Sequence, residues 1–143
     1  MSSLKTLTTA FLLLVALPVY ADEPASSNLR TVEDFIAAFN AHDSRAMAAY
    51  MAEDVDWLSV DGEKIAAESR GKSALIASMD AYFRSCPSCQ SALLGTISTP
   101  GRISAVEVAS WQGESGPKSQ RAISVYEFSD GLIQRVYYFP AEK

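Results

Sequence analysis

The sequence has few of the side chains that metal-dependent and nucleic-acid-binding proteins need. It contains one histidine, His42, and two cysteines, Cys86 and Cys89, among 143 residues. These three side chains do not complete the four ligands of a zinc site, so we expect neither a metal nor another cofactor. Runs of basic residues are missing, and the formal net charge of −5 repels phosphate backbones. Nucleic acid is therefore excluded as an expected partner.

Long apolar runs are also missing, apart from one near the N-terminus. Residues 7–17 are mainly apolar, but a membrane span needs roughly 20 such residues. Lys5 precedes this run, Pro18 breaks it and Ala21 follows as the last of a Val-Tyr-Ala triplet, which is the pattern of a cleavable signal peptide. The sequence predicts a signal peptide over residues 1–21 and a periplasmic or secreted protein with no membrane attachment after cleavage. A buried N-terminal helix or an uncleaved anchor is the alternative.

The remaining chain has the length of one domain. Residues 22–28 are polar and predict a flexible tail before a domain over residues 29–143. In an oxidising compartment the Cys86-Pro-Ser-Cys89 segment favours a structural disulfide. A redox motif and free thiols are the alternatives, but a redox motif places its first cysteine at a helix N-terminus, whereas this pair follows a helical segment.

The periodicity of apolar residues predicts three helices and six strands. Thr31 and Asp34 resemble a capping box that starts the first helix, and His42 lies in the turn after it, as a turn residue rather than a general base. A short helix follows from Asp43 or Ser44, and a third opens at residues 71–73. The expected strands cover residues 55–60, 64–70, 91–98, 103–111, 120–128 and 132–139. Residues 113–119 read as a loose turn.

Four segments carry a resemblance to a known family. They are residues 35–43, 50–57, 70–75 and 126–133, which match a first-helix end, a helix-to-strand junction, the start of a third helix and a final hairpin. In these features the chain resembles the SnoaL-like, nuclear transport factor 2-like superfamily. The resemblance implies an α+β fold in the order α-α-β-β-α-β-β-β-β, with three helices packed on a strongly curved, mainly antiparallel sheet. It also implies a cone shape with a central pocket and a homodimer formed through the sheet.

The resemblance fixes no single function, because this fold carries many. Ketosteroid isomerases of this fold use a tyrosine and an aspartic acid as hydrogen-bond donors and a carboxylate as base. The corresponding positions here are Phe35, Ser124 and Ser59. None of these side chains is basic near neutral pH, and phenylalanine cannot donate a hydrogen bond. Isomerase activity of that type is therefore not expected.

By the family's pattern, one face of the strands looks into the pocket. The predicted lining, open to the alternative of a filled core, is Phe35, Trp57, Ser59, Tyr82, Ser124, Tyr126 and Tyr138. The opposite face is expected to carry Glu107 and Ala109 on one strand and Arg121 and Glu127 on the next. An ion pair of Arg121 with Glu107 or Glu127 is the simplest arrangement.

Three functions remain open at this point. The leading hypothesis is an exported protein that binds a small apolar or aromatic molecule in a neutral pocket, without strong catalytic machinery. The second is an enzyme of the same fold, an isomerase, dehydratase or hydrolase, which needs an ionisable side chain inside the cone. The third is a dimeric structural or interaction module that acts through the sheet face.

Overall fold

The computed structural model describes residues 23–141 of the chain. The predicted signal peptide lies outside these residues. The described elements are α1 (Glu23–Asn40), α2 (Ser44–Ala48), β1 (Met51–Asp61), β2 (Lys64–Arg70), α3 (Lys72–Ser85), β3 (Gln90–Thr99), β4 (Arg102–Gly113), β5 (Gly116–Ser129) and β6 (Leu132–Phe139). This order confirms the predicted α+β class. None of the described helices is long and apolar enough to cross a membrane.

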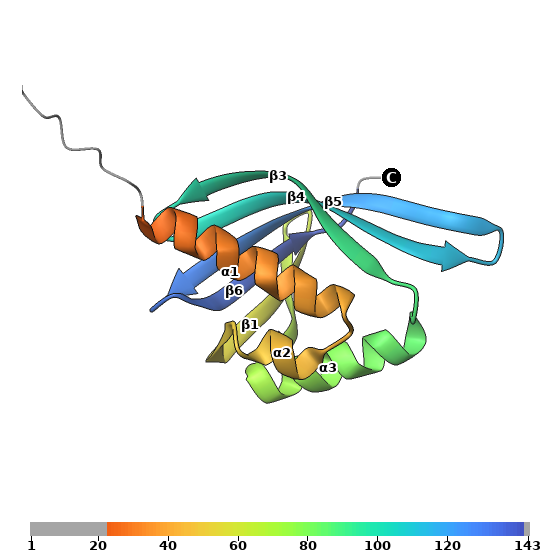
Figure 1. Cartoon of the computed structure of the whole chain (residues 1–143), viewed down its shortest axis with the longest axis horizontal. Helices are drawn as coiled ribbons and strands as arrows, with labels where there is room; N and C mark the ends of the chain where they lie inside the picture. The colour runs from red at the N-terminus through yellow and green to blue at the C-terminus, as the bar shows by residue number, and fades with distance from the viewer. Residues whose placement is uncertain (1–22, 142–143) are drawn as a thin grey trace, which may run out of the picture.

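The strands form one curved sheet in the order β2-β1-β6-β5-β4-β3 (Figure 1). Only the β1–β6 pair is parallel, and the other pairs are antiparallel. Irregular registers interrupt four of the five pairs, and such bulges bend strands. α1 packs against β3, β4 and β6, whereas α3 packs against β1 and β2. The sheet therefore holds both long helices on its concave side.

The core lies between α1, α2, α3 and this concave surface. Val32, Phe35, Met47, Val55 and Val136 are all buried within it. The Phe35 ring lies 6.4 Å from that of Trp57 and 6.3 Å from that of Tyr126, measured between centroids. α1 thus anchors the sheet through one aromatic side chain at the middle of its apolar stripe.

The first helix is longer than the sequence predicted. α1 begins at Glu23, so the expected tail over residues 22–28 is wrong for the residues that the structure describes. Ala25 and Asn28 are buried, and Asn28 Nδ2 donates to the carbonyl of Pro100 at 3.1 Å. Thr31 does not cap the helix, because its hydroxyl donates to the Ser27 carbonyl one turn earlier. The contact with the β3–β4 turn stabilises these first turns, and the local sequence does not encode that contact.

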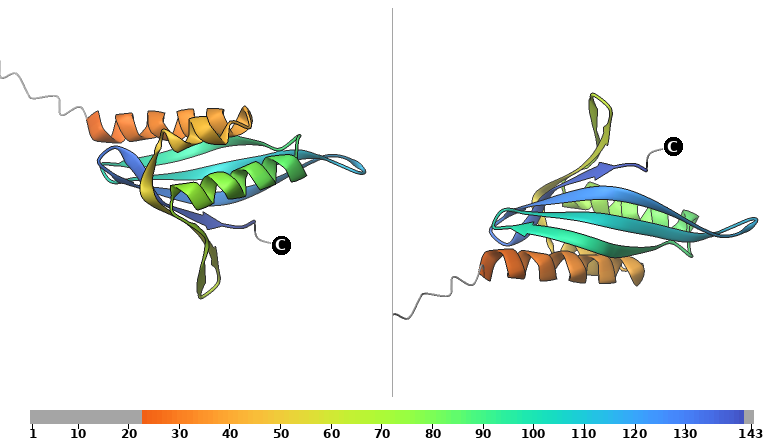
Figure 2. Two further views of the ribbon diagram at one scale, coloured as in Figure 1. Left: turned by 90° about the horizontal axis from the view of Figure 1, so that it is seen from below. Right: turned by 90° about the horizontal axis from the view of Figure 1, so that it is seen from above.

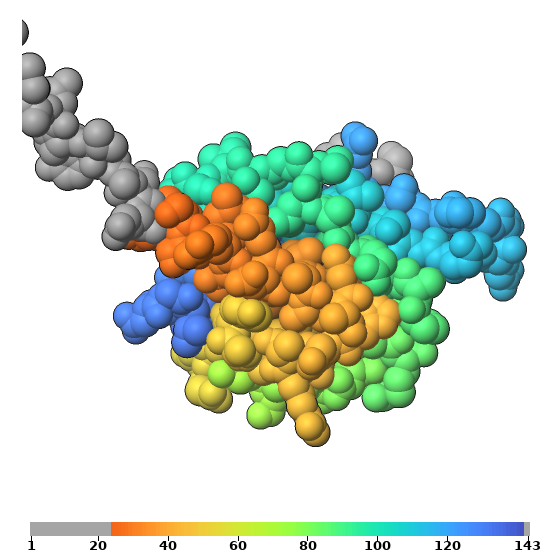
Figure 3. Space-filling model, viewed as in Figure 1, coloured from red at the N-terminus to blue at the C-terminus, as the bar shows by residue number. Residues whose placement is uncertain are grey.

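Two hairpins extend beyond the body of the molecule (Figures 1 and 2). One joins β1 to β2. The other joins β4 to β5, where Gly113 pairs with Gly116 around a two-residue turn. Residues 113–119 were predicted as a loose turn, but most of them belong to β5. In contrast to these hairpins, α1 and α2 lie flat against the body of the molecule (Figure 3).

Candidate functional site

A cavity of about 300 Å³ lies between the helices and the sheet. This volume is at the lower end of the range for small-molecule sites. Its lining comes from seven of the elements named above, and it consists of Phe35, Ile36, Phe39, Trp57, Met79, Tyr82, Ser91, Glu107, Ala109, Gln120 and Tyr138. The wall is therefore mainly aromatic and apolar, with a few polar groups on β3, β4 and β5.

The structure places the predicted lining residues in three different positions. Phe35, Trp57, Tyr82 and Tyr138 line the cavity. Ser124 and Tyr126 are fully buried behind the wall and do not line it. Ser59 also does not line it, because it lies two residues beyond Trp57 on β1, toward the end of the strand that leads into β2. Whether any of these residues binds a ligand remains a prediction.

The cavity has one charged residue, Glu107, that was not predicted to line it. Glu107 was expected on the outer face, but it lines the cavity and is only 7% exposed. The tight turn after β4 pairs Glu107 with Ala122 and Ala105 with Ser124, so Glu107 shares the inner face with Ser124 and Tyr126. A shift of one residue in the β4–β5 register exchanges the two faces of a strand. The loose turn predicted over residues 113–119 did not define this register. The expectation of uncharged walls is therefore wrong.

Three hydroxyl groups hold the Glu107 carboxylate. Ser124 donates to Oε1 at 2.6 Å, and Tyr126 donates to the same oxygen. Ser91 donates to Oε2 at 3.2 Å. Ser91 lines the cavity whereas Ser124 and Tyr126 do not, so Oε2 is the oxygen on the cavity side. A carboxylate oxygen has two acceptor positions, and Oε2 therefore retains one for a ligand.

Asn40, the last residue of α1, fixes Ser91 in place. Its side-chain nitrogen donates to the Ser91 carbonyl at 2.8 Å, and its side-chain oxygen accepts from the Ser91 amide at 2.7 Å. His42 lies in the turn after α1 and has the left-handed φ of 54° expected of a turn residue. Its Nε2 contacts the Cys89 carbonyl, just before β3, at 2.9 Å. The hydroxyl partner of Oε2 is thus positioned from the helix as well as from the strand.

The tyrosines near the cavity are held as neutral phenols. Burial raises the pKa of Tyr126 well above 10, and the adjacent Glu107 carboxylate raises it further. Burial, followed by Glu107, also raises the pKa of Tyr138. Burial raises the pKa of Tyr82. These side chains therefore serve as hydrogen-bond donors and ring surfaces at ordinary pH.

This geometry agrees with comparisons between the chain and known proteins. The sequence profile of the SnoaL-like domain matches residues 32–136. The chain belongs to the SnoaL-like domain family. No curated protein matches it.

Solved structures share the fold of this SnoaL-like domain. A cystatin-fold protein from Novosphingobium aromaticivorans is 21% identical, with 78% of this chain and 96% of that chain covered and a TM-score of 0.68. A candidate polyketide cyclase from Xanthomonas campestris is 22% identical, with coverages of 81% and 91% and a TM-score of 0.60. A candidate ketosteroid isomerase from Kribbella flavida is 16% identical, with coverages of 83% and 81% and a TM-score of 0.67. At these identities the likeness shows the fold alone.

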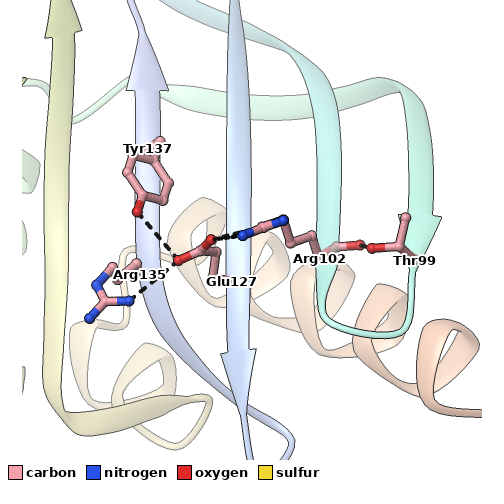
Figure 4. Close-up of polar contacts among 5 residues, drawn as sticks. All are labelled: Thr99, Arg102, Glu127, Arg135 and Tyr137. Atoms are coloured by element: carbon pink, nitrogen blue, oxygen red, sulfur yellow. Dashed lines mark hydrogen bonds and ion pairs between the residues drawn. The ribbon is translucent and has the colours of Figure 1, made fainter.

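On the opposite face of this SnoaL-like domain, Glu127 forms a separate ion-pair group (Figure 4). Arg102 lies 2.7 Å from Glu127 and Arg135 lies 3.5 Å from it, and the Tyr137 hydroxyl donates to it at 3.3 Å. The predicted pairing of Arg121 with Glu107 or Glu127 is wrong, because β4 and β5 pair Arg121 with Val108 and Arg102 with Glu127.

Glu127 is expected to make stability depend on pH. Partial burial raises the pKa of Glu127, but the hydrogen bond and charge of Arg102, together with the hydrogen bonds of Arg135 and Tyr137, outweigh burial and leave this pKa below its usual 4.5. Its contribution is therefore present above pH 4.5 and is lost as the pH falls through the lowered pKa. Glu127→Gln should cost about 0.5–1 kcal/mol at pH 7 and less at pH 3. Urea unfolding at both pH values measures this, and an equal loss at both would contradict it.

Cys86 and Cys89 form a disulfide just after the C-terminal end of α3. The Tyr82 hydroxyl donates to Cys89 Sγ at 3.2 Å. The cysteines thus follow a helix, as expected, and do not begin one.

Replacing both cysteines with serine is expected to lower the free energy of unfolding by about 2 kcal/mol, because the crosslink closes a short loop. Urea unfolding of the oxidised protein and the double variant measures the loss. Reduced native protein is the control and should match the variant. Equal stability of the oxidised protein and the variant would contradict the prediction.

Proposed function

We propose that this SnoaL-like domain binds a small organic molecule with an aromatic or apolar body in the cavity between α1, α3 and the sheet. The observation that carries the proposal is the lining, in which rings from α1, α3, β1 and β6 surround a few polar groups. Such a wall stabilises an apolar ligand through burial, and the polar groups orient it. The Oε2 atom of Glu107 is the acceptor for a donor group on that ligand.

Fluorescence titration with N-phenyl-1-naphthylamine tests the proposal, since this dye becomes bright in apolar sites. We expect a saturable signal from the native protein. Ala109→Phe fills the cavity from β4 and should weaken binding by about tenfold or more. Val108→Phe is the matched control, because Val108 points to the other face of the same strand. An unsaturable native signal, or equal effects of the two variants, would overturn the proposal.

A proton-transfer enzyme is the second candidate, and the position of Glu107 favours it. A carboxylate with a free acceptor position at the wall can take a proton from a bound carbon acid. Solvent deuterium exchange into 2-tetralone, followed by NMR, tests this function. The native protein should exceed the buffer rate, and Glu107→Gln should return exchange to that rate. Exchange at the buffer rate with native protein would eliminate this candidate.

We further propose that the protein is exported and that its signal peptide ends at Ala21. The leader pattern before Pro18 and the disulfide between Cys86 and Cys89 support this. Intact-mass measurement of the protein recovered from the periplasm or the medium should give a chain that begins at Asp22. Recovery of the full-length chain would contradict the proposal.

We also propose a homodimer through the outer face of the sheet. Ile97, Val106, Ile123 and Phe139 are 72%, 39%, 53% and 38% exposed and occupy neighbouring positions on that face. An apolar patch of this kind is typical of an interface. Light scattering at micromolar concentration should give the dimer mass, and Ile123→Glu should give the monomer. A monomeric native protein would end this proposal.

A further inference from the structure

The charge of Glu107 has no counter-charge in the part of the chain that the structure describes. Its side chain is 7% exposed. The ion pairs found within residues 23–141 join Glu53 to Lys72 and Glu127 to two arginines, and no lysine, arginine or histidine is among the cavity-lining residues. A buried charge is costly unless an opposite charge accompanies it.

The three hydroxyl donors satisfy hydrogen bonds but do not neutralise the carboxylate. Ser91, Ser124 and Tyr126 are uncharged donors. Tyr138 on β6 lies in the same sheet and pairs with Ser124, the partner of Glu107, and burial followed by this carboxylate raises the pKa of Tyr138. Glu107 is therefore the one acidic or basic side chain among the residues that line the cavity.

The remaining features of the wall suit a cation. The free acceptor position on Oε2 accepts a hydrogen bond from an ammonium, which has three donors. Phe35, Phe39, Trp57, Tyr82 and Tyr138 place ring surfaces around the same space, and aromatic faces attract cations. A carboxylate-bearing ligand would instead bring a second negative charge to Oε2, and a neutral ligand would leave Glu107 uncompensated.

From these observations, and resting on the proposed function, we infer that the ligand is an amine with an aromatic or apolar body, whose ammonium group pairs with Oε2 of Glu107.

Three probes with one carbon frame and different charges test this inference. They are 1-naphthylmethylamine, 1-naphthalenemethanol and 1-naphthoate, titrated by calorimetry at pH 7, where the amine is a cation and the acid an anion. We expect the amine to bind native protein about tenfold or more tightly than the alcohol, and the anion to bind about tenfold or more weakly. The preference should persist in high salt, because buried charges are poorly screened.

Two single-charge variants show whether Glu107 is the cause. Glu107→Gln keeps the size of the side chain and an oxygen that accepts from Ser124 and Tyr126, and it should bring the three affinities to within about threefold of one another. Glu127→Gln removes the same charge from the outer face of the sheet, and it should leave the preference for the amine unchanged. An equal effect of both variants would assign the preference to overall charge and overturn the inference.

The outcomes separate this inference from the proposed function. Binding of all three probes with similar affinity would refute a cationic ligand and leave a general binding cavity. Absence of binding by all three probes would refute the cavity as a binding site altogether. If Glu107→Gln does not fold, the order of affinities in native protein still decides the question, since tighter binding of the anion or the alcohol contradicts the inference.

Discussion

Phe35→Ala is expected to lower the free energy of unfolding by about 3–5 kcal/mol. Phe35 is 1% exposed and contacts the rings of Trp57 and Tyr126. Truncation removes the main apolar anchor between α1 and the sheet, and the surrounding rings come from separate elements that cannot close the gap by moving one side chain.

Urea unfolding followed by tryptophan fluorescence measures this loss. Ile65→Ala is the control, because Ile65 is 63% exposed on β2, and its substitution should change the unfolding free energy by less than about 0.5 kcal/mol. A Phe35→Ala protein as stable as this control would mean that α1 is not held to the sheet by Phe35.

Glu107→Leu is expected to lower the free energy of unfolding by about 2–4 kcal/mol, although it removes a buried charge. The reason is that the hydroxyls of Ser124 and Tyr126 are fully buried and lose their acceptor. The triple variant Glu107→Leu/Ser124→Ala/Tyr126→Phe removes both of the hydroxyls that Glu107→Leu leaves without an acceptor. Its stability should return to within about 1 kcal/mol of the native protein, because apolar replacement of a whole buried polar group is nearly neutral.

Thermal and urea unfolding of both variants test this non-additive behaviour. The structure predicts that the two additional substitutions stabilise the Glu107→Leu protein, whereas each alone should destabilise the native one. A triple variant less stable than Glu107→Leu would contradict the assigned hydrogen bonds. The triple variant should also lose the preference for amines, because it lacks the Glu107 carboxylate. The stability that is lost by burying this carboxylate would then be tied to ligand binding.

The element order could be predicted from the sequence because it depends on local signals. The apolar period that changes after Cys89 is one such signal, and the Asp61-Gly62 and Asp130-Gly131 pairs, each typical of a hairpin turn, are two others. The beginning of α1 could not be predicted in this way. Its first turns depend on the contact of Asn28 with Pro100, which is distant in sequence.

The chemistry of the site could be predicted only in part, and the reason lies in β4. Val106 and Val108 alternate with Ala105, Glu107 and Ala109, so both faces of this strand carry apolar residues and the alternation does not say which face is inside. A glutamate in such a strand is most simply placed on the surface. The turn between Gly113 and Gly116 decides the register with β5, and that register alone brings Glu107 to Ser124 and Tyr126.

The β4–β5 hairpin that extends beyond the body has a practical consequence. Its tip, Glu114 and Ser115, is exposed and lies beyond the last paired residues, Gly113 and Gly116. Such a tip tolerates inserted sequence, because no packed side chain or ladder hydrogen bond is displaced. An epitope or a fluorophore acceptor peptide placed between these two residues provides a handle for immobilising the protein with the cavity untouched.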